Sequence, residues 1–160
     1  MSNNLVGMGQ IQTAKGPTIL KALALGSCIG IAIWDSERKI GSLAHAILPK
    51  MPENRNNAKA HRYAATAINI MLDQMQKLGS KTPKDKLEAK LVGGANMFPN
   101  LHSIKVGERN TKAARTKLND LRIPIVAEDI GKNFGRTVNF NCQDGSIEIT
   151  TAGGKLWKKI

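Results

Sequence analysis

The chain has 160 residues, of which 41% are hydrophobic and 4% are aromatic, and its 24 basic and 12 acidic residues give a net charge of +12. This length and composition predict one domain, spanning residues 1–160 with an aliphatic core, and they exclude a disordered chain. Two cysteines are too few for a disulfide framework or a cysteine-rich metal site, and no run reaches the ~20 apolar residues of a membrane span.

The first half of the chain is rich in short β-like segments. Alternating or continuous aliphatic residues predict strands at 6–13, 18–24, 29–34 and 40–48. The polar residues 35–38 predict a tight turn between the third and fourth of these strands. We therefore expect those two strands to lie side by side and antiparallel.

The middle of the chain carries both predicted helices. Residues 57–78 repeat apolar side chains at helical spacing, and Gly79 follows as a stop. A strand is expected at 89–92. A second, weaker helix is predicted from an Asn110 cap to Pro124, where the proline ring ends it.

The last part of the chain is again β-like. Strands are predicted at 125–127, 137–141 and 146–151, and Asp144-Gly145 indicates a hairpin because both residues tolerate a positive φ. About eight short strands and two principal helices, without strict alternation, predict an α+β layered sandwich with mainly antiparallel sheets.

Cys28 is the first candidate for chemistry. It lies in Gly26-Ser27-Cys28-Ile29-Gly30, where glycines allow a sharp turn and leave backbone amides free to face a developing oxyanion. A buried cysteine can also be a small core residue, and both interpretations stay open on this segment alone. Cys142 precedes a predicted turn and is interpreted as structural.

A thiol with an ordinary pKa near ~8.5 needs a base in order to act as a nucleophile at neutral pH. His45 lies within the predicted strand that runs antiparallel to the strand after Cys28, so the fold can bring the two together. The alternative is a hydrogen-bonded core histidine. His61 and His102 are expected to face solvent.

Five motifs in this order and spacing resemble the CheD family, from about Val6 to Ile149. They are Leu25-Gly26-Ser27-Cys28, Ala44-His45-Ala46-Ile47-Leu48-Pro49, Gly93-Gly94-Ala95-Asn96-Met97-Phe98, Gly107-Glu108-Arg109-Asn110, and Ala127-Glu128-Asp129-Ile130-Gly131 with Gly135-Arg136.

The resemblance implies an α-β-β sandwich and a cytoplasmic protein-glutamine glutaminase that uses no metal or organic cofactor. Such an enzyme converts glutamines of methyl-accepting chemotaxis receptors to glutamate, and it also binds the phosphatase CheC. The family's nucleophile and its acid/base partner correspond to Cys28 and His45.

Four further residues are expected to support this site or its partners. Gly26 and Ser27 are candidates for oxyanion or orienting roles. Met97 and Phe98, in the glycine-rich segment, are expected to contact a protein partner.

Two positions depart from the family's usual pattern. Ala22 stands where a threonine commonly acts as the third catalytic group, so we expect its absence to lower activity. Lys132 stands where glycine usually follows Gly131. An alternative function is therefore a weakly active or inactive binding partner of CheC or of receptors. Nucleic-acid binding has only the net charge in its favour and no recognition motif, so no nucleic-acid partner is expected.

Overall fold

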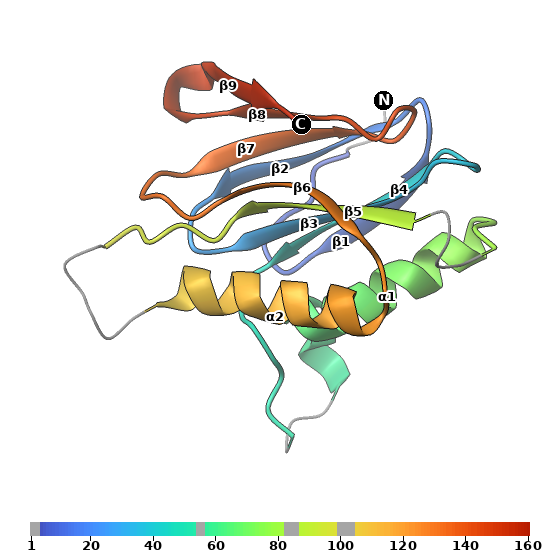
Figure 1. The fold of residues 1–160 in the computed structure, drawn as a ribbon, viewed down its shortest axis with the longest axis horizontal. Helices are drawn as coiled ribbons and strands as arrows, with labels where there is room; N and C mark the ends of the chain where they lie inside the picture. Colours follow the sequence, from blue (N-terminus) through green and yellow to red (C-terminus); the bar gives the residue numbers. More distant parts are fainter. Residues whose placement is uncertain (1–3, 54–56, 82–86, 99–104) are drawn as a thin grey trace.

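The computed structural model describes residues 4–53, 57–81, 87–98 and 105–160. Its elements form three layers, with the helices against one face of a five-stranded sheet and a four-stranded sheet against the other face (Figure 1). The two principal helices are α1 (Ala64–Lys77) and α2 (Val106–Asp120). The predicted α+β class and the α-β-β layering are both confirmed.

The five-stranded sheet is the middle layer and carries most of the site. It consists of β1 (Ile11–Lys15), β4 (Ile40–Ala46), β3 (Ile29–Asp35), β5 (Leu87–Gly93) and β6 (Ile125–Ile130), in that order. Its pairs are antiparallel except β5–β6, which are parallel and connected through α2.

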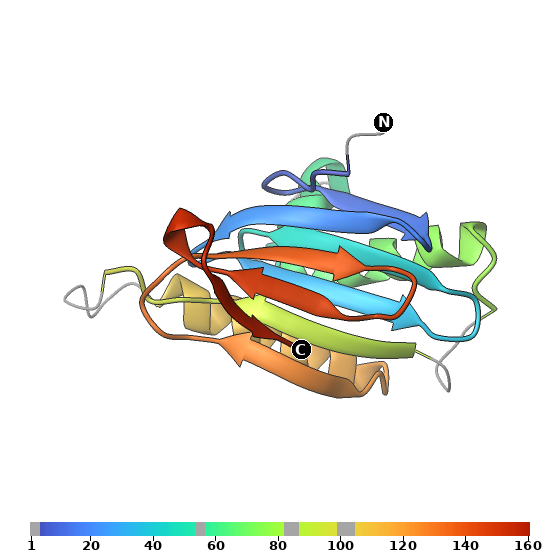
Figure 2. The same cartoon turned by 90° about the horizontal axis from the view of Figure 1, so that it is seen from above.

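The four-stranded sheet is the outer layer and lies over the first sheet (Figure 2). It consists of β2 (Ile19–Leu25), β7 (Arg136–Asn141), β8 (Ile147–Thr150) and β9 (Leu156–Lys159), all paired antiparallel in that order. The predicted hairpin at Asp144-Gly145 is confirmed between β7 and β8, with Gly145 at φ +78°.

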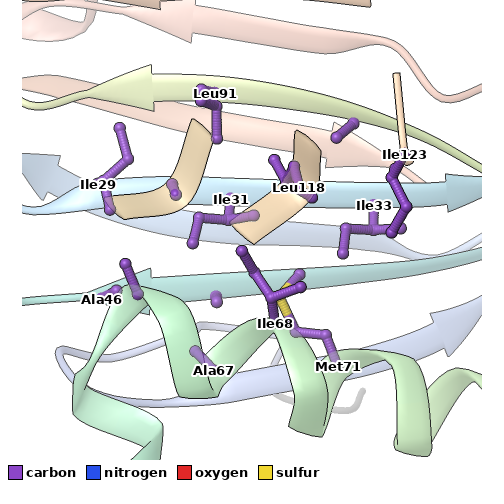
Figure 3. Close-up of a cluster of buried hydrophobic side chains, with 14 of the residues drawn as sticks. Ile29, Ile31, Ile33, Ala46, Ala67, Ile68, Met71, Leu91, Leu118 and Ile123 are labelled. Carbon is purple, nitrogen blue, oxygen red and sulfur yellow. The ribbon is translucent and has the colours of Figure 1, made fainter. Parts of the chain in front are cut away.

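Two apolar cores hold the layers together. On one face of β3, Ile31 and Ile33 point toward the helices and meet Ile68 and Met71 of α1 (Figure 3). On the opposite side of the sheet, Leu43 and its neighbours pack against inward residues of the outer sheet. Burial of each such aliphatic side chain contributes roughly 1.5–3 kcal/mol. The alternating pattern of β3 and β4 thus decides which of their residues lie between the two sheets.

The predicted hairpin between β3 and β4 is confirmed. Asp35 closes it, because its Oδ1 accepts hydrogen bonds of 3.0 Å from the amides of both Glu37 and Arg38. The antiparallel register then places Gly30 opposite His45.

The prediction of one helix over 57–78 is wrong in its first part. Residues Asn57–Arg62 form a 3-10 segment, and the chain is extended at Tyr63 before α1 begins. The break follows from pairing, because the amides of Ile47 and Leu48 donate to the carbonyl of Arg62, and the amide of Ala64 donates to the carbonyl of Leu48. Backbone hydrogen bonds between residues 62–64 and the segment after β4 thus prevent a continuous helix, despite the helical spacing of the apolar residues.

Other predicted boundaries also move. The second helix begins at Val106 instead of Asn110, whose side chain is engaged elsewhere, and it ends before Arg122, which has φ +57°. The first strand begins at Ile11, after a turn at Gly9. The strand β9 was not predicted, since its residues are all exposed and lack a buried alternation.

No helix among the described residues is long and apolar enough to cross a membrane.

Candidate active site

A three-residue turn, Gly26–Cys28, carries the chain from β2 in the outer sheet to β3 in the middle sheet. Two hydrogen bonds of 2.8 Å fix it to the end of β5, from the Ala95 amide to the Gly26 carbonyl and from the Gly94 amide to the Cys28 carbonyl. A Cβ atom at Gly93 would lie 2.5 Å from the Cys28 carbonyl oxygen, so only glycine permits this approach. The same end of the molecule holds the start of α2 (Figure 1).

Cys28 and His45 lie on the same side of the middle sheet, facing the outer sheet. His45 is opposite Gly30 in the β3–β4 register, and Cys28 is two residues before Gly30. Cys28 packs against the inter-sheet core, and His45 alternates with Ala44 of the helix-side core. Cys28 is thus a diagonal neighbour of His45 across these two strands, although His45 Nε2 has no hydrogen-bond partner among the described residues. The predicted pairing of the two strands is therefore confirmed.

The hydrogen bonding of His45 indicates which ring nitrogen is available as a base. His45 is 3% exposed, and its Nδ1 lies 3.3 Å from the carbonyl oxygen of Val6. A carbonyl can only accept, so Nδ1 carries the proton in this contact. In the neutral ring Nε2 then holds a lone pair, and among the described residues this buried atom has no hydrogen-bond partner. The lone pair of Nε2 is free to take a proton.

Burial moves both groups toward their neutral forms. It raises the pKa of the Cys28 thiol, although the backbone N–H of Cys28 opposes the shift. It lowers the pKa of His45, with the Val6 carbonyl acting in the opposite direction. The resting site therefore contains a thiol and a neutral imidazole at neutral pH, and the thiolate has to form by proton transfer.

The turn also supplies candidate oxyanion donors. In the part of the chain that the structure describes, no carbonyl or side chain accepts from the amides of Gly26 and Ser27. Free amides next to a nucleophile are the donors that an oxyanion hole needs. The predicted roles of Gly26 and Ser27 remain predictions.

Ala22 lies in β2, fully buried between the sheets, in the core that Cys28 contacts. The adjacent residue Lys21 holds the N-terminal segment in place, because its carbonyl accepts from the Val6 amide at 2.7 Å. Val6 in turn presents its carbonyl to His45. His45 Nδ1 therefore already has a backbone carbonyl as its hydrogen-bond partner, and an orienting third group would have to bind the same nitrogen.

One buried polar residue at the site was not foreseen. Asn110 lies inside α2 and donates from Nδ2 to the carbonyls of Ser27, at 2.9 Å, and of Ile47, at 3.2 Å. The pattern did contain a signal, since Asn110 shares one helix face with the buried residues Ala114 and Leu118. The preference of asparagine for helix caps led instead to a cap assignment.

A cleft of about 690 Å³ opens beside the turn. It is lined by Ser27, by one side of α2, and by the segments after β5 and β6. The lining basic residues are Lys105, Lys112, Arg115 and Lys132. Lys132 has φ +64°, a left-handed conformation that glycine adopts at lower cost.

Met97 and Phe98 lie at this cleft, with 41% and 68% of their surfaces exposed. Met97 covers the turn, since a Cβ at Gly26 would lie 3.3 Å from its Cγ atom. Exposure excludes a core role for Phe98. An exposed aromatic beside a methionine is available for a partner, so the predicted contact stays open as a prediction.

Of the remaining candidates, the structure describes Cys142 and His61. Cys142 is fully buried, and burial raises the pKa of its thiol to about 11, as suits a structural residue. His61 is exposed, as predicted, and His102 lies outside the described residues. Glu128 pairs with Arg115 at 2.8 Å. Among the described residues, no group of three or more His, Cys, Asp or Glu side chains could hold a metal ion.

The sequence matches the family model described as "CheD chemotactic sensory transduction" over residues 47–151. That match begins after Cys28 and His45, so evidence for the first part of the chain comes from full-length relatives. A protein of Archaeoglobus fulgidus is 40% identical over 159 residues, covering 98% of both chains. One of Lachnoclostridium phytofermentans is 39% identical over 158 residues, covering 97% of this chain and 96% of its own. One of Methanococcus maripaludis is 42% identical over 154 residues, covering 94% and 96%. All three are named "Probable chemoreceptor glutamine deamidase CheD".

Proposed function

The chain belongs to the CheD family, and we propose that it deamidates glutamine side chains of chemoreceptors with Cys28 as nucleophile and His45 as acid and base. The observation that carries the proposal is the unpartnered Nε2 of His45, a buried base on the same sheet face as the thiol. The names of the relatives supply the substrate class.

The first half of the proposed reaction forms a thioester. His45 Nε2 takes the thiol proton as Cys28 Sγ attacks the side-chain amide carbon of glutamine. The free amides of Gly26 and Ser27 donate to the oxyanion. When the intermediate collapses, the carbon–nitrogen bond breaks, and the imidazolium returns its proton to the departing ammonia.

The second half hydrolyses the thioester. Neutral His45 takes a proton from water, the resulting hydroxide attacks the carbonyl carbon, and Cys28 leaves as thiolate and regains the proton. The sum is glutamine and water to glutamate and ammonia, so no redox cofactor enters the balance. The buried setting of His45 strengthens each of these electrostatic contacts.

The proposal includes a cytoplasmic location and protein partners at the cleft. The unpaired state of both cysteines supports a reducing compartment. Lys105, Lys112 and Lys132 favour an acidic surface, and the exposed pair Met97 and Phe98 offers apolar anchors. We place chemoreceptors and CheC among the partners of this surface.

A second candidate function is that of a weakly active or inactive binding partner of CheC or of receptors. Ala22 favours it, because the family's usual third group is missing. The Val6 carbonyl at His45 Nδ1 weighs against it, because the ring is already oriented for base catalysis.

Ammonia release from a purified receptor cytoplasmic fragment tests the proposal. The parent protein should release ammonia, and Cys28→Ser should release none above background, because a hydroxyl ionises far less readily than a thiol. Cys142→Ser serves as the matched control and should keep the parent rate. Absence of release by the parent, together with retained binding to the fragment, would favour the second candidate.

A further inference from the structure

A single buried side chain in α2 contacts both segments that carry the proposed catalytic pair. Asn110 is fully buried and donates to the carbonyls of Ser27 and Ile47. Ser27 directly precedes Cys28, and Ile47 lies two residues after His45. The Asn110 carboxamide therefore bridges the turn of the nucleophile and the strand of the base.

The orientation of this carboxamide is fixed by its partners. Both contacts are carbonyl oxygens, which only accept, so the NH₂ group must face them. Its Oδ1 atom is buried and, among the described residues, has no partner. Leaving a buried acceptor unsatisfied is costly, and asparagine is a weaker helix former than leucine or alanine. Both costs oppose stability at this position of α2.

Local choices that work against stability are expected at functional sites. The face of α2 that carries Asn110 also buries Ala114 and Leu118, and its other buried polar residue, Thr111, bonds only within the helix, to the Gly107 carbonyl. The turn at Gly26–Cys28 belongs to neither sheet, so the position of the Cys28 thiol depends on the hydrogen bonds of the turn and on its packing against the inter-sheet core. Among these contacts, the Asn110 side chain is the one that also bonds to the segment after His45, through the Ile47 carbonyl.

We propose that Asn110 is a positioning residue that fixes the Cys28 turn relative to the segment after His45, and so sets the approach of Cys28 Sγ to His45 Nε2 during proton transfer. The inference rests on the proposed function, since it deepens the role of the same site. Proton transfer needs the two heavy atoms within roughly 2.6–3.2 Å, and a misplacement of about 1 Å costs on the order of 100-fold in rate.

The test compares Asn110→Ala with Ala114→Gly, a buried change in the same helix that touches neither carbonyl. Two quantities are measured: kcat and KM on the receptor fragment, and the pH profile of Cys28 alkylation by iodoacetamide. Asn110→Ala should lower kcat by about 10- to 100-fold with little change in KM. Its alkylation profile should move toward that of His45→Asn, in which the pair is broken. Ala114→Gly should lower Tm and keep the parent's kcat and profile.

Alkylation needs no substrate, so this arm remains informative even if the parent proves not to be a deamidase. A parent-like alkylation profile and kcat in Asn110→Ala, with only a lower Tm, would overturn the inference. If Asn110→Ala fails to fold, Asn110→Ser retains one donor and should lie between parent and His45→Asn. Failure of both to fold would assign Asn110 a purely structural role and overturn the proposal.

Discussion

Burial favours the neutral forms of both members of the proposed pair, Cys28 and His45, at rest. The pKa of the thiol is raised and the pKa of the imidazole is lowered, and desolvation is the main cause of both shifts. Such a site holds no thiolate–imidazolium ion pair in its apolar surroundings at rest. Charges form only when the thiol attacks a bound substrate and the oxyanion develops. The proposed order of proton transfer and attack follows from these two directions.

The first prediction concerns pH. The active form needs neutral His45 and protonated Cys28, so kcat/KM should fall when the histidine gains a proton or the thiol loses one. Because the His45 pKa is lowered, the acid limb should lie below the ordinary histidine value of ~6.5. Because the Cys28 pKa is raised, the alkaline limb should lie above the ordinary thiol value of ~8.5.

A pH series of initial rates on the receptor fragment measures both limbs. We expect kcat/KM to show a broad plateau against pH if burial sets both pKa values. A narrow bell with its limbs inside that interval would show that the charged pair exists at rest and that our order of steps is wrong.

The second prediction concerns Ala22. The Val6 carbonyl already accepts from His45 Nδ1, so Ala22→Thr should raise kcat by less than the several-fold to tenfold expected for a new orienting hydrogen bond. The fully buried position should resist the larger side chain, with a stability loss of about 1–3 kcal/mol. Single-turnover rates and urea denaturation measure the two effects. Ala22→Val is the control for size alone, and a tenfold gain confined to threonine would refute the carbonyl's role.

Sequence alone supplied the candidates Cys28 and His45, whose catalytic roles stay predictions, and only part of what positions them. Cys28 and His45 follow from residue type and from the β3–β4 hairpin, which the turn residues of the sequence predict. The Val6 carbonyl could not be foreseen, because any residue at that position offers the same backbone atom. Asn110 could have been found by placing it on the apolar face of α2.

At the scale of elements, one buried ion pair joins the two sheets beside the site. Arg136 of β7 lies with its Nε atom 3.0 Å from Asp129 Oδ2 of β6, and both side chains are almost fully buried. The two atoms are not aligned as a hydrogen bond, so the attraction is ionic. Arg136 also donates to the carbonyls of Gly93 and Gly131, next to the Cys28 turn and the cleft.

The third prediction follows from this pair. Arg136→Met should lower the free energy of unfolding by about 3–5 kcal/mol, because it leaves the Asp129 carboxylate buried without its main partner. Arg115→Met is the matched control, since the Arg115–Glu128 pair is partly exposed and contributes about 0–1 kcal/mol. Urea denaturation measures both losses. Equal losses in the two variants would show that the inter-sheet pair has no special weight.

Element boundaries could be predicted where they depend on neighbouring residues. The predictions were wrong where hydrogen bonds to distant backbone set the boundary. Both hairpin turns depend on neighbouring residues, and both were predicted correctly. The break before α1 depends on Leu48 pairing with Tyr63, a contact that helical periodicity cannot reveal. The exposed strand β9 exists because it pairs with β8, and its own residues carry no buried face.

At the scale of the whole molecule, three layers bring remote segments to one end. The turn after β2, the end of β5 and the start of α2 meet there, and the N-terminal segment reaches the same site through Val6. The α+β class and the layering followed from the count of strands and helices. The net charge of +12 favours an acidic partner in the proposed function, and several of its lysines line the cleft.

The central claim is that Cys28 and His45 together convert receptor glutamines to glutamate through a thioester. Peptide mass spectrometry of a receptor fragment, incubated with the protein in ¹⁸O-labelled water, tests it most directly. The parent should convert particular glutamines to glutamate and place one ¹⁸O in each new carboxylate, while Cys28→Ser and His45→Asn leave every glutamine unchanged. Conversion by Cys28→Ser at the parent rate would contradict the account.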